Sequence, residues 1–151
     1  FIQNISNVLQ PKGHLFLWID KFLLCEGTTD WLEKTDLKIV DLITWDKMKM
    51  GMGYRTRRQS EYLMVIQKKP LRAKDVWINK SIRDVQSEKI VDKNHPHAKP
   101  IQLQKALIES VSVKGDVILD PCAGGFSVLE ACKLANRDFL GCDLNESNAN
   151  K

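Results

Sequence analysis

The sequence predicts an α/β protein, and three observations carry this prediction. Short apolar segments alternate with segments in which apolar residues recur at helical spacing. One apolar segment runs into a turn with two glycines and then into a helical pattern, in "VILDPCAGGFSVLEA" from Val117 to Ala131. A further apolar segment, 139–142, follows that helical pattern and leads into Asp143. Strand, glycine loop, helix and strand in this order indicate a right-handed βαβ unit with parallel strands.

The elements before residue 70 are expected from periodicity and turn residues. Apolar residues at helical spacing end at Pro11-Lys12-Gly13, which closes a first helix. "HLFLWI" is continuous enough for a buried strand. The expected order is helix 1–10, strand 14–19, helix 20–32 broken by Gly27, strand 37–45, basic loop 48–58 and strand 60–68.

The second half of the chain contains the clearer pattern. Residues 70–94 are polar and weakly periodic, which indicates an excursion from the core. Pro100 suits a first helical turn, and apolar residues at helical spacing continue to Val111. A strand at 117–119 and a helix at 127–134 complete the order before the last strand.

The βαβ unit is a candidate nucleoside site. Its first loop lies at the carboxyl edge of the sheet, where glycines allow close approach and helix amides point outward. Asp143 ends the next strand, 19 residues after Gly124, where a carboxylate can bind a ribose diol. Gly124 and Gly125 alone are equally consistent with an ordinary tight turn.

Asp120 favours one class of cofactor. A carboxylate in this loop repels a dinucleotide pyrophosphate but suits a cationic amino-acid tail, which favours S-adenosylmethionine over NAD. Lys99 stands at the start of the preceding helix, where it can bind a carboxylate, and Pro96 and Pro100 restrict that loop. A rigid loop with exposed histidines is the alternative for this segment.

Composition limits the class of protein. The 151 residues are 43% hydrophobic and 28% charged, as in a soluble globular protein, and no apolar run reaches the roughly 18 residues of a membrane span. The four cysteines form no Cys-x-x-Cys pair and no zinc-ligand spacing, so reduced thiols and no metal are expected. We expect a single domain over 1–151.

Charge is unevenly distributed. From Lys47 to Lys93 there are 13 Lys and Arg against 5 Asp and Glu, a net +8, whereas the whole chain carries +4. This segment can meet a polyanion, or it can be a solvated basic surface.

A family resemblance joins these features. "HPHAKP", the Gly115-Asp116 turn, "LDPCAGG" and "NRDFLGCDL" resemble, in order, the C-terminal half of beta-class amino-group DNA methyltransferases, which modify adenine N6 or cytosine N4. "NVLQPKGHLFLW" resembles the helix and strand that follow the family's catalytic loop. "TRRQSEYLMVIQKK" resembles the family's late antiparallel hairpin, with Glu61 at the usual acidic position.

The resemblance implies a fold and a set of site residues. The fold is a Rossmann-like methyltransferase sheet, mostly parallel with an antiparallel hairpin, flanked by helices and truncated at its N-terminus. The 70–94 segment becomes a short insertion that can recognise DNA, and Trp77 within it either stacks on DNA or packs on the core. S-adenosylmethionine would be bound by His95, Lys99, Pro100, Asp120, Pro121, Cys122, Gly124, Gly125 and Asp143, and DNA by Arg55, Arg57 and Arg58.

The chain departs from the family pattern in two respects. The catalytic Asp/Asn/Ser-Pro-Pro-Tyr/Phe motif is absent from the 151 residues, so no catalytic residue is assigned and a fragment or degenerate copy is expected. Cys122 replaces an aromatic residue, and Phe126 replaces the second loop glycine, where a side chain either clashes or demands a different backbone path.

Three functions remain open at this point. The first is a site-specific DNA methyltransferase from a restriction-modification or phage context. The second is a noncatalytic nucleic-acid-binding or structural remnant of that fold. The third is an RNA or protein methyltransferase that shares the cofactor half.

Overall fold

The computed structural model describes residues 1–90 and 98–144. Contacts within the chain define two compact units, and each is considered by itself. The first unit contains residues 1–77 and 83–87, and the second contains residues 78–82 and 88–151. The segment 70–94 therefore contributes to both units, and the single-domain organisation stays a prediction.

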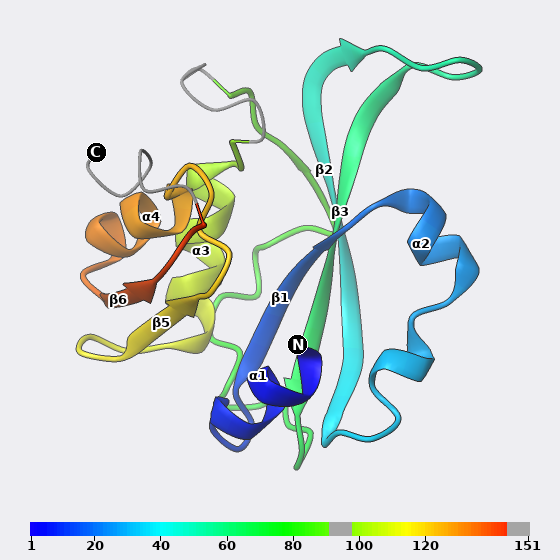
Figure 1. The fold of residues 1–151 in the computed structure, drawn as a ribbon. Helices are drawn as coiled ribbons and strands as arrows, with labels where there is room; N and C mark the ends of the chain where they lie inside the picture. Colours follow the sequence, from blue (N-terminus) through cyan, green and yellow to red (C-terminus); the bar gives the residue numbers. More distant parts are fainter. Residues whose placement is uncertain (91–97, 145–151) are drawn as a thin grey trace. The chain divides into compact units, whose positions relative to one another are not determined.

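The first unit is built on a four-stranded sheet with the order β1-β3-β2-β4. Strands β1, β2 and β3 are labelled in Figure 1. Strand β3 (Arg58–Lys68) pairs antiparallel with both β1 (His14–Ile19) and β2 (Leu37–Gly51), and the short β4 (Val85–Ser87) pairs parallel with β2. The predicted antiparallel hairpin is thus confirmed. Strand β2 runs six residues past the expected end at Trp45, to Gly51, because the ladder resumes after an irregularity where Gly51 faces Arg58, so the predicted loop 48–58 is strand at both of its ends.

The helices of this unit are short. They are α1 (Ile2–Val8), α2 (Lys21–Glu26) and the 3-10 turn Thr29–Trp31, and Gly27 separates the last two as expected. The Lys68 ammonium donates to the carbonyls of Ser6 and Leu9 at 2.5 and 2.8 Å and so satisfies the end of α1. Buried apolar side chains form the core, namely Ile19, Leu32, Leu37, Met64 and Ile66.

The second unit contains the predicted βαβ arrangement. Strands β5 (Val117–Asp120) and β6 (Asp138–Gly141) pair in parallel and are joined by α4 (Ser127–Ala135). Helix α3 (Ile101–Val111) precedes them. The core of the second unit is formed by Ile108, Ala131, Cys132 and Ala135, and Ile118 and Phe139 pack against these side chains. The α/β class is confirmed, and strand pairing across the described residues is both parallel and antiparallel.

Candidate cofactor site and nucleic-acid interface

The loop between β5 and α4 is tied to the end of β6 by backbone hydrogen bonds. The Ala123 amide donates to the Cys142 carbonyl at 2.9 Å, and the Cys142 amide donates to the Asp120 carbonyl at 3.2 Å. These bonds extend the parallel ladder beyond Gly141. They place the glycine loop at the carboxyl edge of the two strands, as the sequence predicts.

The structure brings Gly124 and Asp143 into direct contact. The Gly124 amide donates to Oδ2 of Asp143 at 2.8 Å, across the 19 residues that separate them. Gly124 has φ +51°, a left-handed conformation in which glycine pays no Cβ penalty. The carboxylate is therefore held at the mouth of the loop by a charge-assisted bond.

Asp120 is a second carboxylate at the same edge. Its side chain is half-buried, and Oδ1 accepts from the Cys122 amide at 3.1 Å. Burial raises the pKa of Asp120, the negative charge of Asp143 raises it further, and the Cys122 hydrogen bond lowers it. A half-buried carboxylate with a second negative charge near it favours a cation, so Asp120 can bind an ammonium group.

Phe126 shows how the loop accommodates a large residue at the expected glycine position. It takes the left-handed conformation, with φ 58° and ψ 29°, that the glycine would adopt without cost. Its ring packs edge-to-face against Phe139, with centroids 6.2 Å apart. This packing offsets a backbone cost of about 1–2 kcal/mol. Phe126 is thus a left-handed residue directly before α4, and a backbone path different from that of the family's glycine stays a prediction.

Glu88 is a residue that the sequence did not single out. Its two carboxylate oxygens accept from the Gln102 and Leu103 amides, each at 2.9 Å, at the start of α3. Pro100, the residue before this helix, is fully buried and provides no side-chain cap. Capping rules look within about four residues of a helix start, so a carboxylate further upstream gives no signal.

The remaining predicted cofactor residues differ in burial. Lys99 is half-buried directly before Pro100, Pro121 is half-buried, and Cys122 and Gly125 are exposed. His95 lies outside the described residues. Among the described residues, no group of three or more His, Cys, Asp or Glu can hold a metal ion.

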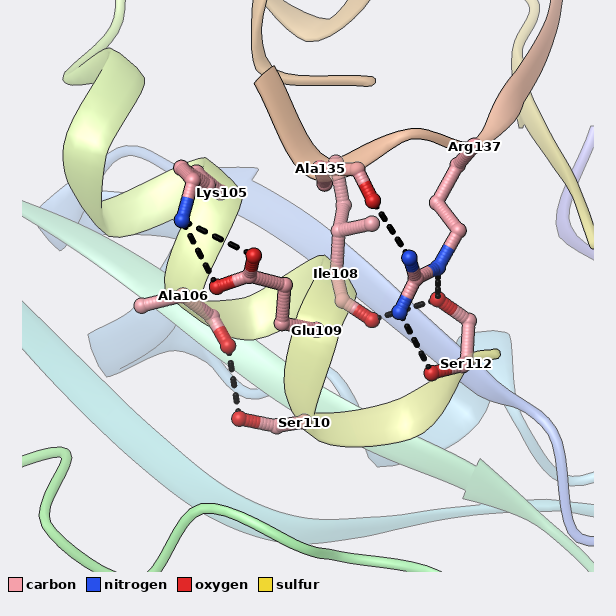
Figure 2. A network of polar contacts seen from close by, with 8 residues as sticks. All are labelled: Lys105, Ala106, Ile108, Glu109, Ser110, Ser112, Ala135 and Arg137. Atoms are coloured by element: carbon pink, nitrogen blue, oxygen red, sulfur yellow. Dashed lines mark hydrogen bonds and ion pairs between the residues drawn. The ribbon is translucent and has the colours of Figure 1, made fainter. Parts of the chain in front are cut away.

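Arg137 connects the ends of the two helices in this unit (Figure 2). Its Nε donates to Ser112 Oγ at 3.0 Å, Nη2 donates to the Ser112 carbonyl at 2.9 Å, and Nη1 donates to the Ala135 carbonyl. Ser112 in turn donates to the Ile108 carbonyl at 2.6 Å. Arg137 of the Asn136-Arg137 pair thus links the C-terminal ends of α3 and α4.

The three predicted DNA-binding arginines lie at the end of the β2–β3 hairpin and are all exposed. They are not equivalent. Arg57 donates to Met52 Sδ at 3.7 Å, and the Arg58 guanidinium stands 5.8 Å from the centroid of the Phe22 ring. Trp77, the other candidate for DNA, packs edge-on against His14 and Phe16.

The fold and the paired carboxylates define a class: α/β proteins with a candidate nucleoside site at the edge of a parallel βαβ unit. The family model for N6/N4 methyltransferases, described as DNA methylase, matches residues 1–150. The chain therefore belongs to this DNA methylase family, which confirms the resemblance.

Known relatives agree with this assignment. The chain is 57% identical over 145 residues to the type II methyltransferase M.HhaII of Haemophilus parahaemolyticus, a match that covers 95% of this chain and 64% of M.HhaII. It is 35% identical over 71 residues to the DNA adenine methyltransferase YhdJ of Escherichia coli K12, covering 47% of this chain and 23% of YhdJ. The chain thus spans about two thirds or less of these relatives.

Solved structures share the fold. A crystal structure of an M1.HpyAVI–SAM complex superposes with a TM-score of 0.79 at 21% identity, over 97% of this chain and 76% of that one. The cytosine-N4-specific PvuII DNA methyltransferase gives the same TM-score at 10% identity, over 96% and 64%. In the described part of the chain, every helix is too short or too polar to cross a membrane.

Proposed function

We propose that this protein is an S-adenosylmethionine-dependent DNA methyltransferase that modifies an exocyclic amino group, adenine N6 or cytosine N4, in the cytoplasm. The observation that carries the proposal is the contact between Gly124 and Asp143, which joins the glycine loop to the carboxylate after the next strand. Family membership supports the reaction class. Because named relatives act on adenine and on cytosine, the target base is left as either.

The chemistry of the candidate residues supports this cofactor. Asp120 would accept from the methionine ammonium, and Lys99 would bind the methionine carboxylate. Asp143 would bind the ribose hydroxyls, since a carboxylate has about four acceptor positions and one is taken by the Gly124 amide. Backbone contacts would come from the stretch Pro121, Cys122, Gly124 and Gly125, and the further cofactor contacts would be Pro100 and His95, the latter outside the described residues.

The bound cofactor would supply an electrophilic methyl group on a sulfonium. The chain's own contribution would be to hold that nucleoside and to bind the nucleic acid. Arg55, Arg57 and Arg58 would contact phosphates, while the target base leaves its stack at a cost of a few kcal/mol. No catalytic residue is assigned, since the 151 residues contain no Pro-Pro pair.

Calorimetric titration with S-adenosylmethionine tests the cofactor site. Replacing Asp143 by Ala should weaken binding about tenfold to a hundredfold, because charge-assisted bonds contribute about 1.5–3 kcal/mol each. Asp138→Ala is the matched control, an exposed carboxylate at the opposite end of the same strand. Absence of binding by the wild type at millimolar ligand would refute the cofactor assignment.

Transfer of labelled methyl to DNA by the protein expressed from its complete reading frame tests the activity. Transfer to DNA supports the proposal. Cofactor binding with transfer only to RNA or protein would favour the third candidate function. DNA binding with neither cofactor binding nor transfer would favour the noncatalytic remnant.

A further inference from the structure

The end of the β2–β3 hairpin extends past its neighbouring strands (Figure 1). Strand β1 pairs with β3 only as far as Tyr62, and β4 pairs with β2 only as far as Asp46. We call residues Lys47–Arg58 the ribbon tip. Among the described strands, the ribbon tip has none beside it other than its own two.

The ribbon tip combines positive charge with exposed apolar side chains. It contains five basic residues and no Asp or Glu, the basic residues being Lys47, Lys49, Arg55, Arg57 and Arg58. It also exposes Met50, Met52 and Tyr54 by 70%, 84% and 109%. Exposed apolar groups gathered between cations suit a polyanion that also offers apolar surface, and nucleic acid bases between phosphates have this character.

The base of the ribbon tip is fixed by Asp46. Its Oδ1 accepts from the Met48 amide at 2.8 Å and from Gln59 Nε2 at 2.9 Å, and its Oδ2 accepts from Ser87 Oγ at 3.3 Å. Met48 is left-handed, with φ 52°. The ladder shifts here, so that Asp46 faces Ser60 and Gly51 faces Arg58.

This shift places four residues of β2 opposite one residue of β3, so Lys47–Met50 bulge out of the ladder. Beyond the bulge the chain turns so tightly that a Cβ on Gly53 would lie 2.2 Å from the Thr56 carbonyl oxygen. The exposed side chains are therefore presented by a bulge and turn of defined geometry rather than by a long irregular loop. Such preorganisation lowers the entropic cost of binding.

We infer that the ribbon tip enters a groove of duplex DNA, where Met52 and Tyr54 contact the bases and Arg55 and Arg57 contact the flanking phosphates. A two-stranded ribbon has the width that the major groove admits. Arg58, the third arginine of the proposed phosphate contacts, stands 5.8 Å from the centroid of the Phe22 ring. This inference rests on the proposed function, which makes DNA the substrate.

Salt dependence separates the two kinds of contact. Fluorescence anisotropy with a labelled duplex of mixed sequence would be measured over a range of salt concentrations. The double variant Met52→Ser, Tyr54→Ser should weaken binding roughly tenfold or more with an unchanged salt slope, because these contacts are not ionic. Arg57→Gln should lower the slope by about 1.

Matched controls lie at the other end of β2. Lys38→Gln removes an exposed cation, and Ile39→Ser removes an apolar side chain that is 40% exposed. Both should leave affinity and slope unchanged. Circular dichroism of every variant checks that the fold is retained.

The outcomes are distinct. If the wild type binds and methylates DNA while the double variant and its Ile39→Ser control bind equally well, the ribbon inference is overturned and the proposed function stands. A double variant that loses affinity together with salt slope would also overturn it, since Met52 and Tyr54 would then act through the phosphate contacts. If the wild type neither binds nor methylates duplex DNA, the proposed function fails as well.

Discussion

Replacement of Arg137 by Ala should destabilise the second unit by about 2–4 kcal/mol. The guanidinium donates three hydrogen bonds, two to Ser112 and one to the Ala135 carbonyl. A hydrogen bond to a charged group contributes up to about 3 kcal/mol, but Arg137 is half-buried, so water replaces part of what is lost and about 1 kcal/mol per bond is expected. The change also leaves the carbonyl of buried Ser112 without this donor.

The assay must report on the right unit. All four tryptophans lie in the first unit, so tryptophan fluorescence does not follow the unfolding of α3 and α4; they are Trp18, Trp31, Trp45 and Trp77. Amide hydrogen exchange of α3 and α4 reads the second unit directly, and urea denaturation followed by far-ultraviolet circular dichroism gives the loss of secondary structure in the whole chain. Protection in these helices should fall in the variant.

Two further variants make the test specific. Arg137→Lys keeps the charge but not the planar fork, so it should recover less than half of the loss. Lys114→Ala removes an exposed cation between α3 and β5 and should change stability by less than about 0.5 kcal/mol. A loss below about 0.5 kcal/mol for Arg137→Ala would refute the view that this residue fastens the two helices.

Three other predictions follow from the same unit. Burial and Asp143 raise the pKa of Asp120, so the ionised carboxylate lowers the stability of the fold as pH rises. Asp120→Asn should therefore raise the urea midpoint at neutral pH, show no gain below pH 3.8 and bind S-adenosylmethionine more weakly. A lower urea midpoint of the variant at neutral pH would contradict this. Burial raises the pKa of Cys132 to about 11, so a disulfide reagent near neutral pH should label the three exposed cysteines and reach Cys132 only after unfolding; labelling of native Cys132 would count against its burial. Gly141→Ala should cost about 1–3 kcal/mol in urea denaturation, because a Cβ would lie 2.2 Å from the Phe139 ring and 2.8 Å from the Asp120 carbonyl oxygen, whereas Leu140→Ala at an exposed position should have little effect.

The sequence predicts the βαβ unit well because its signals are local. Gly124 and Asp143 follow two strands of clear apolar character, and parallel strands bring their carboxyl ends together. The contact between these residues is therefore readable from spacing alone. Their roles toward a cofactor are a separate matter and stay predictions.

The features that sequence reasoning missed depend on tertiary contacts. Strand β4 has only three residues and forms by pairing with β2, so its sequence shows no strand periodicity that could predict it. Asp46 fixes the bulge through the Met48 amide and the Gln59 and Ser87 side chains, two of which are remote in sequence. Glu88 caps α3 from 14 and 15 residues before the two amides that it accepts from, Gln102 and Leu103.

The Glu88 cap makes the start of α3 depend on a residue that lies 13 positions before Ile101. The Gln102 and Leu103 amides are donors in the first turn of the helix, where no carbonyl of the helix itself can accept from them. A lineage that loses this carboxylate therefore needs another acceptor for both amides, or α3 begins one turn later.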